Sequence, residues 1–329
     1  VAAIAGREIG KDVAALRTEE EAEAARARVV ALLRRPLTAD AAVQIALLNN
    51  RGLQAAYSEL GLAEAAMVQA SLPPSPGLSI ERLAGPTEIE LEKRIVGNIL
   101  ALATTPLRAE IAADRFRQAQ LRAAEETMRL AAETRRAFYR AVAQRQLVGM
   151  LTQAKSAAET AAKLSHRLGE TGAINKLDQA REQVFYAEMT AQLAIARQRA
   201  ASERERLIRL MGLWGADLDF RLPDALPALP RRPRAAPDAE REAVQRRIDL
   251  QIARLELEAL RKSYGLTQTT RFVNLLELSG IGRTRRERAT DERIRDRGFE
   301  VELQIPIFDF GEARARQAAD AYMQAVHRL

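Results

Sequence analysis

The segment that follows Pro106 contains no further proline until Pro223, and Gly149 is the only glycine in its first half. Proline and glycine are the residues that most often interrupt helices, so this segment predicts one helix over Thr105–Leu168, roughly 95 Å long at 1.5 Å per residue. The stretch Gly169–Asn175 breaks the pattern, and a second helix is predicted from Lys176 to Met211. Two long helices joined by a short turn form an antiparallel helical hairpin.

The composition also predicts a helical chain. Hydrophobic residues make up 47% of the chain but aromatic residues only 4%, and charged residues make up 29%. A high content of Ala, Glu, Arg and Leu is typical of long helices packed side by side. The net charge of +7 comes from arginine and favours either an anionic partner or, because the charges alternate in sign, solvated helix faces. The absence of cysteine excludes disulfides and thiolate metal sites but leaves the compartment open.

Shorter helices are predicted on either side of the hairpin. Arg17–Arg35 has the pattern of an amphipathic helix, and Thr38 that of the N-cap of a helix that kinks near Asn49 and stops at Ser71. A further helix is expected over residues 238–265, after a proline-rich segment that we expect to be an extended linker. The chain has no apolar run of the roughly 18 residues that a transmembrane helix requires.

Two segments alternate between apolar and charged residues with a period of two, as strands do. In Thr87–Ile95 and in Gly298–Phe308, aliphatic residues alternate mainly with glutamate. Weaker alternation in Pro76–Gly85 and Arg271–Gly280 supplies a partner strand for each. All four segments have about the length that a tilted strand needs to cross a bilayer. The pattern fits a wall with lipid on one side and water on the other, and also a half-buried sheet in a soluble α+β protein.

Parts of the chain resemble each other at nearly constant spacing. Residues 53–65 resemble residues 250–262, residues 78–85 resemble residues 275–282 at the same offset, and Ala112–Ala119 resembles Ala318–Ala325 at a slightly larger one. The order helix, strand, strand, helix therefore occurs twice, as in a tandem repeat of large period. The extra residues of the second copy lie in the arginine-rich segment Arg283–Arg297. We expect this segment to be a loop that either binds lipopolysaccharide phosphates or is simply solvated.

These elements divide the chain into four parts. Residues 1–36 are an N-terminal segment, and residues 37–214 are the first repeat, with a β-hairpin at 76–95 and the long helical hairpin at 105–211. Residues 215–237 are the proline-rich linker. Residues 238–329 are the second repeat, with a helix, a β-hairpin at 271–308 and the start of another helix.

Three stretches resemble the TolC-like outer-membrane efflux protein family. "PLTADAAVQIALLNNRGLQAAYSELGLAEA", which begins at Pro36, resembles the family's opening helix, with its leading Leu-Thr and double Asn. "VELQIPIFDFGEARARQAADAYMQA", from Val301, resembles the family's passage from a barrel strand into a helix. "RLGETGAINKLDQAREQ", from Arg167, resembles the turn at the family's periplasmic tip. The resemblance covers almost all of the chain from Pro36 to Leu329.

The resemblance implies a mainly α fold with membrane β-structure, in which long helical hairpins form an α-barrel and β-hairpins give four strands per protomer to a trimeric, twelve-stranded barrel. It implies a passive export duct in the outer membrane of a Gram-negative bacterium, with residues 1–36 and the helices in the periplasm. The implied partners are two further copies of the chain, a periplasmic membrane-fusion adaptor, an inner-membrane pump and outer-membrane lipid. Because the family's second repeat has its own helical hairpin, we expect the second repeat to be truncated at Leu329. The alternative is a soluble coiled-coil scaffold with a small β-sheet.

The resemblance also implies roles for particular residues. The tip turn is the expected adaptor-docking surface and Asp178 the expected gate residue, although Asp178 could equally cap the helix that starts near Lys176. Threefold symmetry would make the inward glutamates an acidic lumen that favours cations, or a solvated surface without selectivity. The docking residues are Leu168, Gly169, Gly172, Ala173, Ile174 and Leu177; the lumen-facing residues are Glu88, Glu90, Glu92, Glu300 and Glu302; the lipid-facing residues are Ile89, Leu91, Val301, Leu303 and Ile305.

No catalytic, cofactor-binding or metal site is predicted. The two histidines, His166 and His327, stand outside any H-E-x-x-H motif, and the chain has no glycine-rich phosphate-binding motif. His166 is more simply explained as a surface helix residue than as a ligand. Nucleic-acid binding is not expected, because no aromatic residues interleave with the basic ones. The sequence therefore predicts a channel without a cofactor rather than an enzyme.

Overall fold

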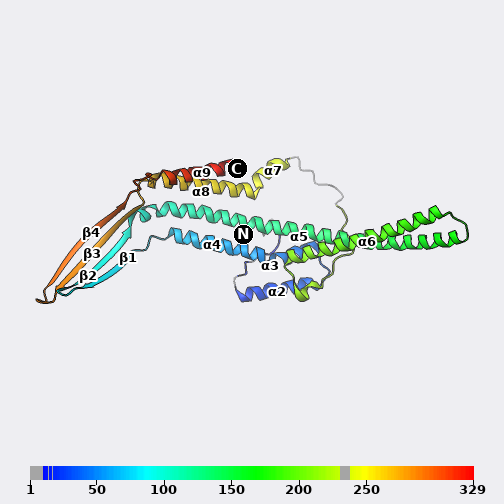
Figure 1. Cartoon of the computed structure of the whole chain (residues 1–329), viewed down its shortest axis with the longest axis horizontal. Coiled ribbons are helices and arrows are strands. Elements are labelled where there is room, and N and C mark those ends of the chain that lie inside the picture. The colour runs from blue at the N-terminus through cyan, green and yellow to red at the C-terminus, as the bar shows by residue number, and fades with distance from the viewer. Residues whose placement is uncertain (1–9, 14, 17, 230–237) are drawn as a thin grey trace. The chain divides into compact units, whose positions relative to one another are not determined.

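The computed structural model of the chain describes residues 10–13, 15–16, 18–229 and 238–329. These residues belong to two compact units, which we describe one at a time (Figure 1). The first unit consists of Val1–Tyr57 and Ala123–Ala239, and the second of Ser58–Arg122 and Glu240–Leu329. Parts of the predicted N-terminal segment 1–36 and of the predicted linker 215–237 lie outside the described residues.

Helices of the first unit begin where the sequence places capping side chains. α2 (Glu19–Leu33) follows Thr18, whose hydroxyl accepts a hydrogen bond from the Glu21 nitrogen while the Glu21 carboxylate accepts one from the Thr18 nitrogen. α3 (Ala39–Asn49) follows Thr38, and the Thr38 hydroxyl lies 3.1 Å from the Ala41 nitrogen. The predicted N-cap at Thr38 is therefore confirmed. The chain is extended at Asn50 before α4 (Arg51–Ser71) begins, as the predicted kink requires.

The two long helices of the hairpin are α5 (Ile99–Glu170) and α6 (Lys176–Met211). The predicted start of the first helix at Thr105 is wrong, because α5 begins before Pro106 and includes it. Three side chains bond to the backbone of its first turns. Asn98 accepts a hydrogen bond from the Ala101 nitrogen at 2.7 Å, and the hydroxyls of Thr104 and Thr105 donate to backbone carbonyls one turn earlier. A proline so close to a capped helix end disturbs few backbone hydrogen bonds.

The core of the first unit is mainly aliphatic, as the low aromatic content predicts. Ile45 of α3, Phe138 of α5 and Met211 of α6 belong to one buried cluster. Phe220 and Leu222 also belong to it and are only 3% and 6% exposed. The first part of the predicted linker therefore packs on the core, after the short 3₁₀ helix η2 (Gly215–Leu218), and does not extend freely.

The second unit contains two helices where the sequence predicts one. α7 (Ala239–Arg246) and α8 (Ile248–Thr270) are separated by Arg247, whose backbone is extended at φ −61° and ψ 119°. α8 continues through Gly265, which was the predicted end. The last helix, α9 (Glu312–Arg328), packs against α8.

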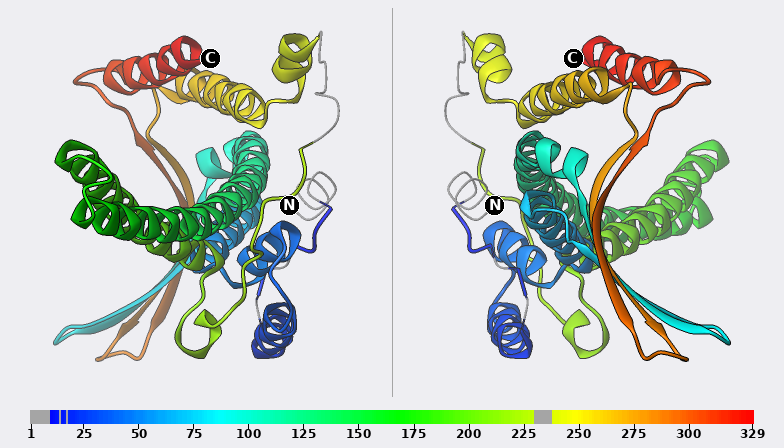
Figure 2. Two further views of the ribbon diagram at one scale, coloured as in Figure 1. Left: turned by 90° about the vertical axis from the view of Figure 1, so that its right-hand side faces the viewer. Right: turned by 90° about the vertical axis from the view of Figure 1, so that its left-hand side faces the viewer.

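Four antiparallel strands complete the second unit. They are β1 (Gly77–Ala84), β2 (Glu88–Asn98), β3 (Leu275–Glu287) and β4 (Arg293–Gln304), in that order across one sheet. Figure 2 shows the four strands twisting together. β2 pairs with β3 along its full length, although the two are far apart in the sequence, and β1 and β4 are the edge strands.

β3 and β4 differ most from the sequence prediction. Most of Arg283–Arg297, predicted as a loop, is strand, and only residues 288–292 form the turn, with Asp291 at φ 54°. The strand predicted to reach Phe308 ends at Gln304, two residues before Pro306, which has no N–H to donate to a neighbouring strand. The misassigned strand residues include six arginines and two acids. A period in hydrophobicity cannot detect a segment that is charged on both faces.

Candidate functional site

One face of the sheet, which we call the glutamate face, carries most of the acidic strand residues. The strand register places Glu81 opposite Glu92 and Glu92 opposite Arg283, so these side chains project to the same side. All five glutamates predicted to face a lumen lie on it. The face consists of Gly77, Ser79, Glu81, Leu83, Glu88, Glu90, Glu92, Arg94, Val96, Asn98, Leu275, Glu277, Ser279, Ile281, Arg283, Arg285, Glu287, Ile294, Asp296, Gly298, Glu300, Glu302 and Gln304.

Two arginines link the glutamates across three strands. The Arg283 guanidinium of β3 lies 2.7 Å from the Glu90 carboxylate and 2.8 Å from that of Glu92, both on β2. Arg94 of β2 lies 3.0 Å from Glu92 and 2.8 Å from Glu300 on β4. These charge-assisted hydrogen bonds connect β2, β3 and β4 through their side chains.

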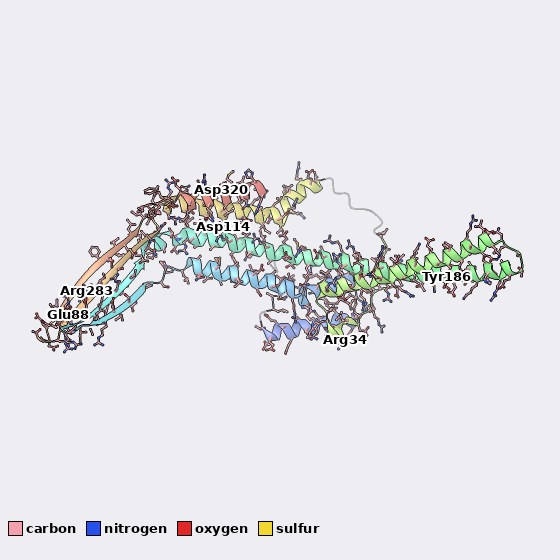
Figure 3. The ribbon with its side chains drawn as sticks, viewed as in Figure 1. Arg34, Glu88, Asp114, Tyr186, Arg283 and Asp320 are labelled. Atoms are coloured by element: carbon pink, nitrogen blue, oxygen red, sulfur yellow. The ribbon has the colours of Figure 1, made fainter. Side chains whose placement is uncertain are left out.

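A third arginine, Arg285, lies 3.3 Å from Glu88. Figure 3 labels Glu88 and Arg283 at the end of the sheet that carries the turns. The sequence analysis missed Arg283 and Arg285 because it assigned both to a loop. Their local sequence gave no period that could have placed them in a strand, because Arg286 on the opposite face is charged as well. The glutamate face still carries nine carboxylates and only three guanidinium groups, so it remains acidic.

The opposite face of the sheet is apolar at the end nearer the helices, and Ile89 and Leu91 of β2 continue the apolar residues toward the turns. Phe299 is 79% exposed and Leu78 70% exposed. An apolar patch of this kind that the described part of the chain leaves uncovered marks an interaction surface. Four of the five residues predicted to face lipid lie on this side, whereas Ile305 lies one residue beyond β4. The apolar residues of this face are Leu78, Ile80, Ile89, Leu91, Ile95, Leu276, Leu278, Phe299, Val301 and Leu303.

The sequence "IPIFDFG" forms a tight junction between β4 and α9. Gly311 has φ 72°, and a Cβ atom there would lie 2.3 Å from the carbonyl oxygen of Arg271. The Asp309 carboxylate accepts a hydrogen bond from the Gly311 nitrogen at 3.0 Å. Arg314 donates to the Arg271 carbonyl and to the Asn274 side chain. The glycine is therefore required by the close approach of the α8 end.

The turn between α5 and α6 is closed by its own backbone. The Ala173 nitrogen donates to the Leu168 carbonyl at 2.9 Å, and Gly172 has φ 76°, which only glycine adopts without strain. Leu177 is 61% exposed and Leu168 38% exposed. The predicted docking residues therefore lie together at the end of the hairpin, and two of their leucines are exposed there.

Asp178 does not cap α6. The N-cap is Asn175, whose side-chain oxygen accepts a hydrogen bond from the Asp178 nitrogen at 2.9 Å. Asp178 lies in the first turn, where its charge still favours the positive end of the helix dipole, and its carboxylate lies 3.5 Å from Arg181. The capping explanation of Asp178 is therefore wrong, and its side chain is partly exposed.

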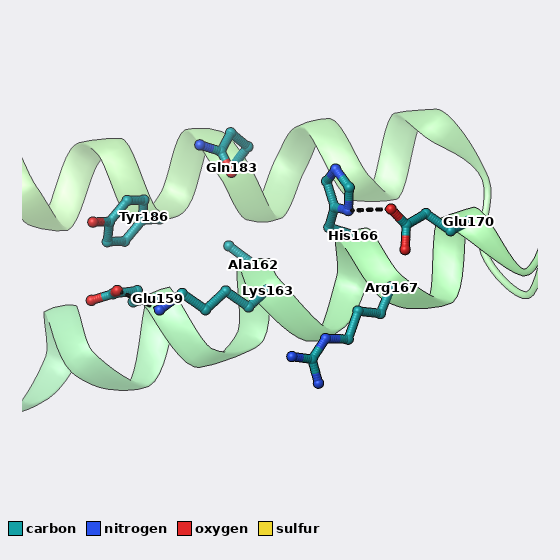
Figure 4. Close-up of a pocket in the computed structure, with 8 residues that line it drawn as sticks. All are labelled: Glu159, Ala162, Lys163, His166, Arg167, Glu170, Gln183 and Tyr186. Carbon is teal, nitrogen blue, oxygen red and sulfur yellow. Dashed lines mark hydrogen bonds and ion pairs between the residues drawn. The ribbon is translucent and has the colours of Figure 1, made fainter.

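A groove of about 460 Å³ lies between the two helices of the hairpin, next to this turn (Figure 4). The Lys163 ammonium lies 2.7 Å from the Glu159 carboxylate, which lowers the pKa of Glu159 and raises that of Lys163. His166 Nδ1 lies 3.3 Å from Glu170, and the His166 side chain is exposed. His166 thus lies on the helix surface, as predicted. Among the described residues, no three His, Cys, Asp or Glu side chains group as metal ligands do.

Within the described ranges, no helix combines the length and the apolar character that a membrane-crossing helix has.

The chain is similar to known proteins over most of its length. A family model described as outer membrane efflux protein matches residues 240–328. The cobalt-zinc-cadmium resistance protein CzcC of Cupriavidus metallidurans is 26% identical over 309 residues, which are 88% of this chain and 69% of that protein. The CmeC outer membrane channel of Campylobacter jejuni superposes with a TM-score of 0.69 at 14% identity, over 88% of this chain and 66% of CmeC. CusC superposes with a TM-score of 0.66 at 16% identity, over 88% of this chain and 72% of CusC.

A four-stranded sheet with opposite faces, attached to a long helical hairpin, is the architecture of the outer-membrane channels that this chain matches. The chain is thus similar to the TolC-like outer-membrane efflux protein family in its matched C-terminal segment, in its relative CzcC and in its fold. Members of this family are channel proteins of the Gram-negative outer membrane that extend into the periplasm. An efflux channel, and not a soluble coiled-coil scaffold, is therefore the function that these relationships support.

Proposed function

We propose that three copies of this chain form one passive export duct that works with a periplasmic adaptor and an inner-membrane pump. The observation that carries this proposal is the chemical difference between the two faces of the sheet, one acidic and one apolar and exposed. An apolar outer face and a polar inner face are what a strand wall needs between lipid and water. β1 and β4, the two edge strands, would pair with neighbouring copies and so leave no open edge.

The residues singled out in the sequence would take their roles in this assembly. Glu88, Glu90, Glu92, Glu300 and Glu302 would face the lumen, and Ile89, Leu91, Val301 and Leu303 would face lipid, with Ile305 at the border. The hairpin end, with Leu168, Gly169, Gly172, Ala173, Ile174 and Leu177, would dock the adaptor. Asp178 would serve as the gate residue. The division into two repeats, residues 37–214 and 238–329, would let one chain supply two wall segments.

We further propose that the cargo includes divalent metal cations. Two facts support this proposal: the name of the relative CzcC refers to cobalt, zinc and cadmium resistance, and the glutamate face has three times as many carboxylates as guanidinium groups. A surplus of carboxylates lining a pore favours cations over anions. A strain that lacks the gene should become sensitive to these ions, and sensitivity to an unrelated toxic compound alone would contradict a metal cargo.

The duct can be tested with two neighbouring substitutions on β4 that add the same charged side chain to opposite faces. Val301→Lys places a charge on the apolar face and costs about 2–4 kcal/mol if that face meets the middle of the bilayer. Glu302→Lys places it on the glutamate face, where water is expected. We expect the Val301→Lys protein to fail to fractionate with outer membranes, and wild type and Glu302→Lys to fractionate there and conduct ions in planar bilayers.

Equal fractionation of the two variants would contradict the assignment of faces. A wild-type protein that stayed monodisperse without detergent and conducted no ions would contradict the duct itself. Glu302→Lys should also lower the preference for cations, because it changes the charge of the lumen by two in each copy.

A further inference from the structure

The apolar face changes character toward the end of the sheet that carries the turns. Along β4 the residues on this face are Leu303, Val301 and Phe299, followed by Arg297, Arg295 and Arg293. Each neighbouring strand adds one cation at these heights, namely Arg82 of β1, Lys93 of β2 and Arg286 of β3, while β2 also places Ile89 and Leu91 there. We call the basic group the arginine belt, and it consists of Arg82, Lys93, Arg286, Arg293, Arg295 and Arg297.

The belt residues differ from the arginines of the glutamate face in their partners. Arg94, Arg283 and Arg285 each form ion pairs with glutamates. In the belt, Arg286 pairs with Asp291, and the other five cations have no ion pair or hydrogen bond within the described part of the chain. No strand residue on this face is acidic. Five free cations packed on one face repel each other unless an anion binds among them.

The centre of this face is recessed because β3 contributes glycines, which have no side chains, at that place. Gly280 lies between Ile95 and Phe299, and Gly282 lies between Lys93 and Arg297. A Cβ atom added to either glycine would have no neighbour within 4 Å. The gap between the side chains of β2 and β4 is therefore about two strand spacings wide, roughly 9.5 Å. It runs from the apolar residues into the belt.

We propose that this face binds an anionic membrane lipid, with its phosphate headgroup among the arginines of the belt and its acyl chains against Phe299, Val301 and Ile95. Arginine suits this role because its planar guanidinium donates two parallel hydrogen bonds to a phosphate. A free phosphate ion would make no contact with the apolar residues next to the belt. A zwitterionic lipid has no net negative charge to balance the cations of the belt. The inference rests on the proposed function, in which this face meets lipid.

The test compares two triple variants of the full-length protein. R293Q/R295Q/R297Q removes three belt cations. R140Q/R199Q/R206Q removes three exposed arginines of α5 and α6 that have no ion pair or hydrogen bond with any residue that the structure describes. The detergent-solubilised proteins are incubated with phosphatidic acid or with phosphatidylcholine of the same acyl chains, and retained lipid is counted by native mass spectrometry. We expect the belt variant to bind phosphatidic acid at least about tenfold more weakly than wild type, and the control variant to match wild type.

Three results would overturn the inference. They are undiminished binding by the belt variant, an equal loss in the control variant, and displacement of the lipid by inorganic phosphate at the concentration of the lipid itself. The last result would mean that the acyl chains contribute nothing.

Two further measurements distinguish a failure of the lipid-binding proposal from a failure of the proposed duct. R293K/R295K/R297K keeps the charges and should retain more phosphatidic acid than R293Q/R295Q/R297Q, which guards against a variant that only misfolds. All proteins are also inserted into phosphatidylcholine vesicles. Failure of wild type to insert would contradict the proposed duct, whereas insertion of every protein with equal retention of phosphatidic acid would contradict the belt alone.

Discussion

At the scale of single residues, backbone contacts explain why several sequence signals exist. The double asparagine of the opening helix binds the end of α6: Asn49 donates to the carbonyls of Met211 and Gly212, and Asn50 donates to that of Leu210. Gly212 has φ 66°, and a Cβ atom there would lie 2.6 Å from the Asn49 carbonyl oxygen. The asparagines and the glycine therefore form one junction, although they lie far apart in the sequence.

Two glycine substitutions should have opposite effects on stability. Gly212→Ala should lower the free energy of unfolding by about 2–3 kcal/mol, because alanine is strained at positive φ and its Cβ meets the Asn49 carbonyl. Gly149→Ala, in the middle of α5 with open space around it, should raise that free energy by about 0.5–1 kcal/mol. Chemical denaturation followed by circular dichroism measures both. Destabilisation of the same size in both variants would contradict this explanation.

One nearly buried carboxylate depends on a single lysine. Asp114 is 4% exposed and lies 2.6 Å from the Lys262 ammonium, with Arg117 further away at 3.4 Å. This hydrogen bond raises the pKa of Lys262 above its usual 10.5. Lys262→Met should cost about 2 kcal/mol at neutral pH, because the Asp114 charge loses its closest partner.

The pH dependence of that loss has a definite sign. Because the pKa of Lys262 is higher in the folded state than in the unfolded state, the charged lysine stabilises the fold fully below pH 10.5. This stabilisation is lost as the pH rises through the pKa of Lys262 in the folded protein. The difference in thermal midpoint between wild type and Lys262→Met should therefore shrink at strongly alkaline pH. Lys163→Met removes an exposed pair instead and should leave the midpoint nearly unchanged at neutral pH.

At the scale of elements, the turn of the helical hairpin keeps a defined conformation without buried apolar side chains. Its turn residues are largely exposed, and backbone hydrogen bonds and the Asn175 cap close it. The exposed leucines at this end are thus presented by a defined backbone. A docking surface on a preformed turn loses less conformational entropy on binding than a flexible one would.

The cap can be tested locally. Asn175→Ala removes the acceptor for the Asp178 nitrogen and should weaken the first turn of α6 by about 1 kcal/mol, which corresponds to roughly fivefold faster amide exchange there. Asn175→Ser keeps a capping oxygen and serves as the control. Hydrogen–deuterium exchange of residues 168–180 measures the effect. Unchanged exchange in Asn175→Ala would show that the turn holds without its cap.

At the scale of the whole molecule, the sheet is open at β1 and β4, and the proposed trimer closes it. The chain has no cysteine, so introduced cysteines report on this contact without background. Leu78→Cys on β1 is combined with Phe299→Cys or with Val301→Cys on β4. After oxidation, disulfides between neighbouring copies should give a covalent trimer as the largest product on a denaturing gel. Bands that continue beyond the trimer, or only monomer at every pair, would contradict closure by three copies.

Local patterns in the sequence were enough to predict the helical hairpin, the capping of α3, the kink at Asn50 and the alternation of β2. Each depends on residues within a few positions of each other. The outer half of β3 and β4 could not be predicted this way, because Arg283–Arg297 is charged on both faces and has no hydrophobic period. This segment forms strands because β2 forms backbone hydrogen bonds with β3 and because glutamates of β2 form ion pairs with Arg283 and Arg285.

The sequence by itself therefore determined which segments are helical, where they turn and that one strand face is apolar, since propensity, capping and periodicity act locally. Only the tertiary structure decided that Arg94, Arg283 and Arg285 neutralise part of the glutamate face, while Arg293, Arg295 and Arg297 on the other face have no ion-pair partner among the described residues. The reason is the register: shifting β3 by one residue would move Arg283 and Arg285 to the other face, and shifting β4 by one residue would move Arg293, Arg295 and Arg297.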